Sequence, residues 1–139
     1  LRRDRYDPAQ ESVDHKCIEL EHIQPGTGRL LGYCTSTTQE SLKSVVMPND
    51  VLFGKLRPYL RKFHISDCEA VCSTEIWVLR ANESICDPRY LYFLVQTDAF
   101  TRASSISAGS KMPRAEWEIV QNSTFRLPGI VEQRAICEV

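Results

Sequence analysis

The sequence predicts a mixed α/β (α+β) fold, in which a twisted, largely antiparallel sheet is covered by two or three helices and carries long loops on one side. Three observations lead to this prediction. Short stretches with a two-residue alternation of apolar side chains recur in the first 80 residues. A segment with helical spacing follows Asp87-Pro88. Hydrophobic residues make up 42% of the 139, which is enough for one domain with its own core.

The N-terminal third is expected to contain two strands. Residues 1–12 are polar and charged and predict a poorly ordered lead-in. Residues 17–23 alternate and predict the first strand, which ends at the turn signal Gln24-Pro25-Gly26-Thr27-Gly28. Residues 30–34 predict a second strand. The segment 35–43, rich in Thr, Ser and Gln, predicts a loop whose side chains could hydrogen-bond bases or phosphates.

Residues 48–65 form the most informative stretch. Pro48-Asn49-Asp50 predicts a turn, and an alternating strand with two unlike faces follows it. Pro58 has no amide hydrogen to donate, so the strand should lie at a sheet edge or bend at Arg57-Pro58. One face is apolar: Leu52, Gly54, Leu56 and Leu60. The other has three cations, a tyrosine and no acidic residue: Lys55, Arg57, Tyr59 and Arg61.

A cationic face without counter-charges suits a polyanion, although an ordinary solvated sheet face has the same composition. A second segment without acidic residues, 99–115, contains Arg102, Lys111 and Arg114. The two basic segments could flank one groove. The net charge of the whole chain is −1, so this local segregation, and not the overall charge, points to nucleic acid.

The second half of the chain predicts strands first and helices afterwards. Residues 69–73 and 75–80 predict one broken or two successive strands, with Trp77 in the core. Asp87 is the predicted N-cap of a helix that extends to about Arg102. The remaining expected elements are a short helix from Pro113 through Val120, a last strand over 123–127, and a helix that begins after Pro128-Gly129.

The sequence offers no constellation of catalytic residues and no metal-binding signature, and we expect neither. Its six cysteines contain no Cys-x-x-Cys pair, so we expect free, mostly buried thiols in a reducing cytoplasm. There is no apolar run of membrane-spanning length and no signal-peptide pattern. The chain opens without methionine and stops inside an apparent helix, so we expect it to be a fragment.

Three motifs resemble those of one family. Residues 49–62 read Asn49-Asp50-Val51-Leu52-Phe53-Gly54-Lys55-Leu56-Arg57-Pro58-Tyr59-Leu60-Arg61-Lys62. This stretch resembles a signature of the specificity subunit of type I restriction-modification enzymes, with Asn49 where that family has glycine. The segments 109–117 (Gly-Ser-Lys-Met-Pro-Arg-Ala-Glu-Trp) and 125–136 are similar to two further motifs of that family, with Gly129 in place of a proline. Ser73-Thr74-Glu75-Ile76 matches a shorter family element.

The resemblance implies a target recognition domain over residues 1–128 and the start of a spacer helix over 129–139. Such a domain would read one half of a bipartite site in double-stranded DNA and would perform no chemistry. A second recognition domain of the same subunit would read the other half. The modification and restriction subunits would methylate adenine and cut DNA, and S-adenosylmethionine, ATP and Mg would belong to them. We expect no membrane association and a cytoplasmic location.

Within that reading, the expected DNA-contacting residues fall into two groups. Contacts to the phosphate backbone are expected from Lys55, Arg57, Tyr59, Arg61, Lys62, Lys111 and Arg114. Candidates for reading bases are Thr37, Thr38, Gln39 and Ser41. Three alternatives stay open: a recognition domain of a related DNA methyltransferase, an enzyme that uses cysteines or carboxylates as nucleophiles, and a protein-interaction module without DNA.

Overall fold

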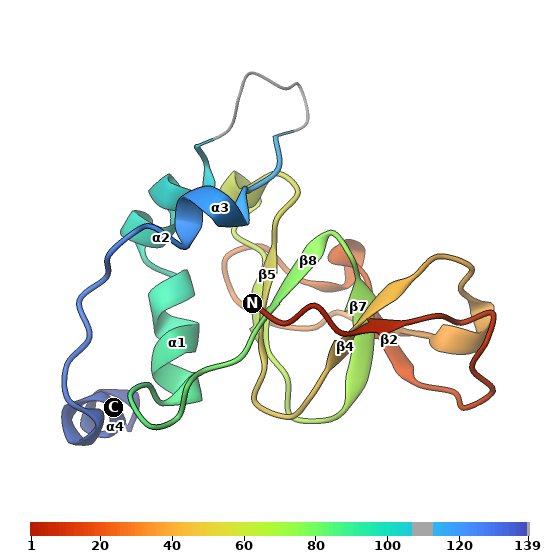
Figure 1. Cartoon of the computed structure of the whole chain (residues 1–139), viewed down its shortest axis with the longest axis horizontal. Helices are drawn as coiled ribbons and strands as arrows, with labels where there is room; N and C mark the ends of the chain where they lie inside the picture. The colour runs from red at the N-terminus through yellow and green to blue at the C-terminus, as the bar shows by residue number, and fades with distance from the viewer. Residues whose placement is uncertain (107–112, 139) are drawn as a thin grey trace.

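The computed structural model of the chain describes residues 1–106 and 113–138 and confirms the mixed α/β class (Figure 1). Within these residues the strands form two sheets where the sequence predicted one. The larger has the order β1-β4-β7-β2-β3, and the smaller has the order β6-β5-β8. All strand pairs are antiparallel except β2 with β7. The strands are β1 (Arg5–Tyr6), β2 (Lys16–Ile18), β3 (Cys34–Thr35), β4 (Lys43–Val46), β5 (Val51–Gly54), β6 (Phe63–Ile65), β7 (Ala70–Ser73) and β8 (Ile76–Leu79).

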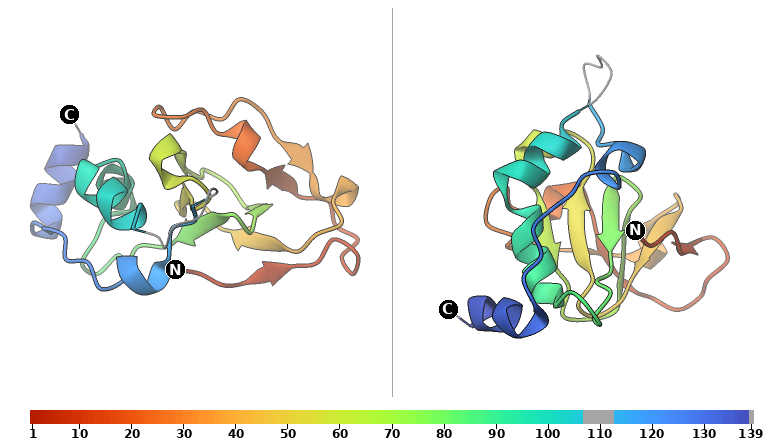
Figure 2. Two further views of the ribbon diagram at one scale, coloured as in Figure 1. Left: turned by 90° about the horizontal axis from the view of Figure 1, so that it is seen from above. Right: turned by 60° about the vertical axis from the view of Figure 1, so that its left-hand side comes forward.

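The molecule has three layers because β5 and β8 are buried on both faces. Along β5, Val51 and Phe53 pack in a cluster that includes Val95 and Phe100 of the helices. Leu52, between them in sequence, packs instead against residues of the larger sheet. Strand β8 alternates in the same way. The predicted core position of Trp77 is confirmed, and the residue packs on the side of the helices. Two cores therefore lie on either side of the smaller sheet, and Figure 2 shows the helices on its outer face.

The predicted two-faced ribbon over 51–65 is wrong, although the bend predicted at Arg57-Pro58 is confirmed. Strand β5 ends at Gly54, and a 3-10 turn, η3 (Pro58–Leu60), reverses the chain into β6. Arg57 and Arg61, which flank η3, have left-handed φ values of +51° and +54°. Moreover, β5 is the central strand of its sheet and not an edge strand. Fully buried strands read as continuous apolar runs, so alternation alone could not place this one.

The turn before β5 explains the one departure from the family signature. Asn49 has φ +71°, a left-handed conformation that glycine adopts freely and asparagine tolerates better than most residues. The backbone N–H of Asn49 donates to Ser66 O at 2.7 Å. The next residue, Asp50, is 1% exposed and forms two 2.8 Å hydrogen bonds with the Arg80 guanidinium. The backbone conformation at position 49 is therefore one that both glycine and asparagine can adopt.

The four α-helices of the described residues are α1 (Pro88–Val95), α2 (Asp98–Ser104), α3 (Trp117–Val120) and α4 (Ile130–Cys137). The Asp87 N-cap is confirmed, since its side chain accepts from Arg89 N at 2.9 Å. The single helix predicted up to Arg102 is wrong: it breaks after Val95, and Thr97 caps α2 by accepting from Phe100 N. The predicted strand over 123–127 is also wrong, since that segment runs unpaired along the helical layer.

The N-terminal segment is better ordered than the sequence predicted. Arg5 and Tyr6 pair with β4, Tyr6 is buried, and Arg2 N donates to Val78 O at 2.8 Å. Strand β2 is shorter than predicted and passes into the 3-10 turn η1 (Leu20–His22). A third such turn, η2 (Ser36–Thr38), occupies the predicted loop 35–43. In the described part of the chain, none of the helices has the length and apolar character needed to cross a bilayer.

Candidate nucleic-acid interface

Three motif segments that are far apart in sequence meet at the end of β5. Lys55 N donates to Glu75 O at 2.9 Å, and Ala115 N donates to Lys55 O at 2.7 Å. Arg57 N donates to Pro113 O at 2.6 Å, and Leu56 and Arg114 form an isolated antiparallel bridge. The backbone of 113–115 therefore extends the sheet beyond Gly54. This arrangement gives the three motifs one location.

The Arg114 side chain is held by a carboxylate at this junction. Its guanidinium forms hydrogen bonds of 2.9 and 3.0 Å with the carboxylate of Glu75. Glu75 belongs to the Ser-Thr-Glu-Ile element. The hydrogen bond to Glu75 raises the pKa of Arg114. Fork-to-carboxylate pairing fixes the direction of the guanidinium. Half of the Arg114 side chain is still exposed, so it can also face a ligand.

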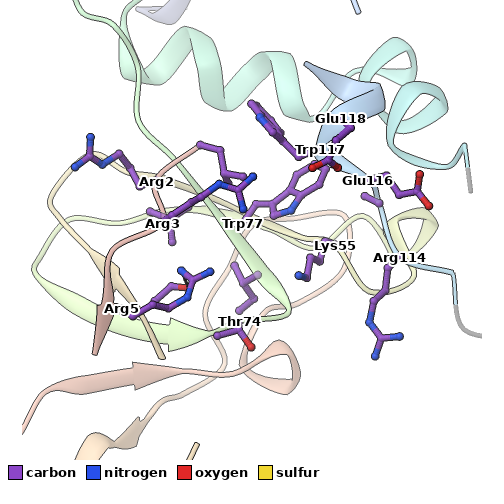
Figure 3. Close-up of a pocket in the computed structure, with 15 residues that line it drawn as sticks. Arg2, Arg3, Arg5, Lys55, Thr74, Trp77, Arg114, Glu116, Trp117 and Glu118 are labelled. Atoms are coloured by element: carbon purple, nitrogen blue, oxygen red, sulfur yellow. Dashed lines mark hydrogen bonds between the residues drawn. The ribbon is translucent and has the colours of Figure 1, made fainter. Parts of the chain in front are cut away.

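A hollow of about 220 Å³ opens beside the junction. This volume is below the range of about 300 to 1,000 Å³ that is usual for small-molecule sites, so it suits one charged group of a larger ligand better than a whole cofactor. Trp77 and Trp117 pack edge to face at 5.3 Å and form part of the wall. Figure 3 shows the N-terminal arginines on one side and Lys55 and Arg114 on the other. The basic residues that line the hollow are Arg2, Arg3, Arg5, Lys55 and Arg114.

These cations differ in their partners. Arg2 is paired with Asp4 at 3.0 Å, and Arg114 with Glu75. Within residues 1–106 and 113–138, the Arg5 side chain donates to the neutral Ser44 hydroxyl alone, at 3.1 Å. Among the described residues, Arg3 and Lys55 have no carboxylate within ion-pair distance. Glu116 and Glu118 also line the hollow, so the surface is mixed, but its positive groups outnumber its negative ones. Such a surface favours an anionic ligand.

Two of the predicted backbone-contacting residues have hydrogen-bond partners within the chain. Arg61 donates to Gln96 O at 2.6 Å and reaches Asp98 and Thr101 at 3.4 Å, so it joins η3 to the corner between α1 and α2. Lys62 Nζ donates to Leu20 O at 2.7 Å in η1. Because the ribbon turns at η3, the cations expected on one face point to different parts of the molecule. The sequence alternation alone could not reveal this separation.

The other predicted contacts have varied positions. Arg57 and Tyr59 are exposed at the η3 turn, next to the junction. Lys111 lies outside the described residues. Thr37, Thr38 and Ser41 are exposed and Gln39 is half-buried around η2. Figure 1 shows η2 at the end of the larger sheet away from α2 and α3. The structure therefore brings Lys55 and Arg114 together, but it does not place the predicted base-reading loop beside them.

Sequence reasoning missed the three N-terminal arginines. The signal was present, because Leu1-Arg2-Arg3-Asp4-Arg5 is basic and the next residue is an aromatic that a sheet can bury. The polar composition led instead to the prediction of a poorly ordered lead-in. In the structure, the pairing of β1 with β4 and the bridge from Arg2 to Val78 carry these side chains to the hollow.

No protein-family model matches the chain. It is 25% identical over 118 residues to the type I restriction enzyme EcoDI specificity subunit of Escherichia coli, covering 83% of this chain and 26% of that subunit. Its fold matches the crystal structure of the HsdS subunit from Thermoanaerobacter tengcongensis with a TM-score of 0.85 at 26% identity. A second match is a chain from a structure that addresses complex assembly and conformational transition of the type I R-M system. It has a TM-score of 0.83 at 25% sequence identity.

Both structural matches cover 99% of this chain and 38% of the other. The chain thus spans about a quarter to two fifths of the proteins that it matches. The resemblance to one target recognition domain of a type I specificity subunit is therefore confirmed in sequence and in fold.

Proposed function

We propose that this chain is a sequence-specific reader of double-stranded DNA, which recognises one half of a bipartite target in a type I restriction-modification system. The observation that carries the proposal is the match to specificity subunits over nearly the whole chain. The basic hollow supports it, because it gathers cations from three segments at the junction of the family motifs.

Phosphate contacts would come from Lys55, Arg3 and Arg5, which have no carboxylate partners among the described residues, and from the exposed face of Arg114. Arg57 and Tyr59 at the tip of η3 extend this surface. Contacts of this kind hold a duplex in register without reading its sequence. We do not assign phosphate contacts to Arg61 and Lys62, whose charged groups already donate to backbone carbonyls.

Base reading would come from a different part of the domain. Thr37, Thr38 and Ser41 are exposed, and hydroxyls there can donate to or accept from base edges in the major groove. Gln39 donates to Cys34 Sγ and to Thr38 Oγ1, which orients its amide. Separation from the basic hollow is compatible with one duplex lying along the domain, held at one end and read at the other.

In the whole subunit, residues 1–128 would form the recognition domain and residues 129–139 would begin the spacer helix to a second recognition domain. Gly129 is the N-cap of α4, which Figure 1 shows at the far end of the molecule from the sheets. Modification and restriction subunits would supply methylation and cleavage, together with S-adenosylmethionine, ATP and Mg. This domain would be non-catalytic and would act where host DNA is, in the cytoplasm.

The test has two steps. Methylome sequencing of a host that carries the complete system would give the bipartite target. Fluorescence anisotropy with the isolated chain would then compare the matched half-site with a scrambled duplex at several salt concentrations. We expect tighter binding to the matched half-site, and affinity for both that falls as salt rises. Failure to bind any duplex at low salt would overturn the proposal.

A further inference from the structure

A cluster of sulfur and carboxylate groups lies at one edge of the larger sheet, among residues that do not line the basic hollow. Cys17 on β2 is paired directly with Cys34 on β3, and Glu19 follows β2. One ligand atom from each of the three lies within 4.8 Å of the other two. Sequence spacing gave no sign of this cluster, because the two cysteines are 17 positions apart and only the strand pairing joins them.

We propose that Cys17, Glu19 and Cys34 form a binding site for a thiophilic divalent metal ion such as Zn²⁺. Two thiolates and one carboxylate are donors that zinc prefers, and a fourth position would be left for water. Cys17 is fully buried, whereas Cys34 and Glu19 are partly exposed. An ion would therefore reach the site from the side of Cys34 and Glu19.

Lys43 balances the charge of such a site. Its Nζ donates to Glu19 Oε1 at 2.6 Å, and its side chain is 4% exposed. Two thiolates, one carboxylate and a divalent ion carry a net charge of −1, which the ammonium group neutralises. Gln39 Nε2 lies 3.4 Å from Cys34 Sγ and can donate to the thiolate as an outer-shell group. Without an ion, Lys43 and Glu19 form a nearly buried ion pair, which gives the carboxylate a fixed position.

Binding requires the loss of two protons. In the structure the Cys17 thiol is 3.6 Å from Glu19 Oε1, and the Cys34 thiol is 3.5 Å from Cys17 O. Burial raises the pKa of Cys17, and the groups that face it are Cys34, Glu19 and Lys43. In these two contacts each thiol is the donor. One ion would displace both hydrogens, so that two S–H bonds are replaced by two metal–sulfur bonds and two protons enter solution.

The site would strengthen a weak part of the sheet. Strands β2 and β3 pair over only two residues on each side, and β3 leads directly into η2. A metal bridge between Cys17 and Cys34 would fix β3 to its neighbour and would stabilise the start of the Thr37–Ser41 segment. The site itself does not depend on the proposed role in DNA recognition.

Cobalt provides a direct test with the chain from 1 to 139, reduced and freed of metal by a chelator. We expect one Co²⁺ to bind per chain, with a near-ultraviolet sulfur-to-cobalt charge-transfer band that Zn²⁺ removes. About two protons per ion should be released in weakly buffered solution. The band should be lost in Cys34→Ser, where the side chain is only half-buried, and retained in Cys68→Ser, whose thiol lies outside the cluster.

A second measurement uses the unmodified chain, so it does not depend on a variant that folds. Zn²⁺ should protect Cys34 from alkylation while Cys68 stays reactive. Absence of a charge-transfer band at stoichiometric Co²⁺ would overturn the proposal. A band that survives in folded Cys34→Ser, or alkylation of Cys34 that Zn²⁺ does not slow, would also overturn it.

Discussion

Lys55 and Arg61 belong to one motif and carry the same charge, but they lie in opposite environments. Lys55 lines the basic hollow and has no carboxylate partner among the described residues. Arg61 donates to Gln96 O at the C-cap of α1 and to the Thr101 hydroxyl in α2. The left-handed residues that flank η3 turn the chain between them. The two side chains therefore differ in the intramolecular acceptors within their reach. We expect this difference to separate residues that stabilise the fold from residues that contact DNA.

The distinction extends to the other polar groups of the motifs. Asp50, Arg61 and Gln133 have hydrogen-bond partners for their side chains inside the chain. Lys55 and Arg3 do not, among the described residues. Groups of the first kind should affect the free energy of unfolding when they are replaced, whereas groups of the second kind should affect affinity for DNA.

The largest effect is expected for Asp50→Ala. The carboxylate is 1% exposed, holds Arg80 with two hydrogen bonds and accepts from Met47 N at 2.8 Å. Removing one partner of a buried pair costs about 3 to 5 kcal/mol. Arg80 is about one-third exposed, so we expect the lower end, about 3 kcal/mol. Urea denaturation measures the loss. Asp67→Ala, at an exposed site nearby, should change stability by less than about 0.5 kcal/mol.

Equal stability of the two variants would show that Asp50 does not hold the turn. Asp50 and Lys55 belong to one motif. The division into residues that stabilise the fold and residues that contact DNA would then fail for this pair.

The sequence predicted this turn but not its partner. Pro48-Asn49-Asp50 marks a turn through local chemistry alone, and Asp87-Pro88 marks a helix start in the same way. By contrast, the pairing of Asp50 with Arg80 depends on the register of β5 with β8, which no local pattern encodes. The same holds for the split of the strands into two sheets. Strands β7 and β8 are both apolar, and only Thr74 and Glu75 separate them, yet they belong to different sheets.

The second largest loss of stability is expected for Gln133→Leu. Gln133 lies in the first turn of α4. Its amide accepts from Asp87 N and donates to Ile85 O and Pro128 O, each at 2.8 Å, and its side chain is fully buried. Gln133→Leu leaves three backbone groups without partners, and we expect a loss of about 2 kcal/mol. Gln121→Leu, at an exposed site at the end of α3, is the control. If Gln133→Leu lost less unfolding free energy than Gln121→Leu, the hydrogen bonds of Gln133 would not contribute to the stability of the domain.

The third effect is that of Arg61→Ala. It removes the 2.6 Å hydrogen bond to Gln96 O and the contacts with Asp98 and Thr101. Because the guanidinium is one-third exposed, we expect a loss of about 1 kcal/mol. The salt dependence of DNA binding should not change. Arg29→Ala, at an exposed site, should leave thermal stability unaltered. A flatter salt dependence in Arg61→Ala would mean that this guanidinium contacts phosphate after all.

The candidate site was predictable in its parts but not as a whole. The motifs identified Lys55 and Arg114, and the backbone hydrogen bonds between 55–57 and 113–115 show why they occur together. Glu75, the partner of Arg114, was visible only as a motif residue. The N-terminal arginines join the site through β1, a strand of two residues that is too short to produce an alternation in sequence. Short strands and long-range ion pairs are where local patterns carry least information.

The smallest effect on stability, and the most specific effect on binding, is expected for Lys55→Ala. Its ammonium group makes no hydrogen bond with the described residues, so truncation should change the unfolding free energy by less than about 0.5 kcal/mol. If it contacts one phosphate, affinity should fall for matched and scrambled duplexes alike, and the slope of log K against log salt should flatten by about 0.9. Lys62→Ala is the matched control, because its Nζ already donates to Leu20 O. It should lose some stability and keep the slope of the unmodified chain. If instead both lysines changed the slope equally, or neither did, the acceptors inside the chain would not be what separates the two roles.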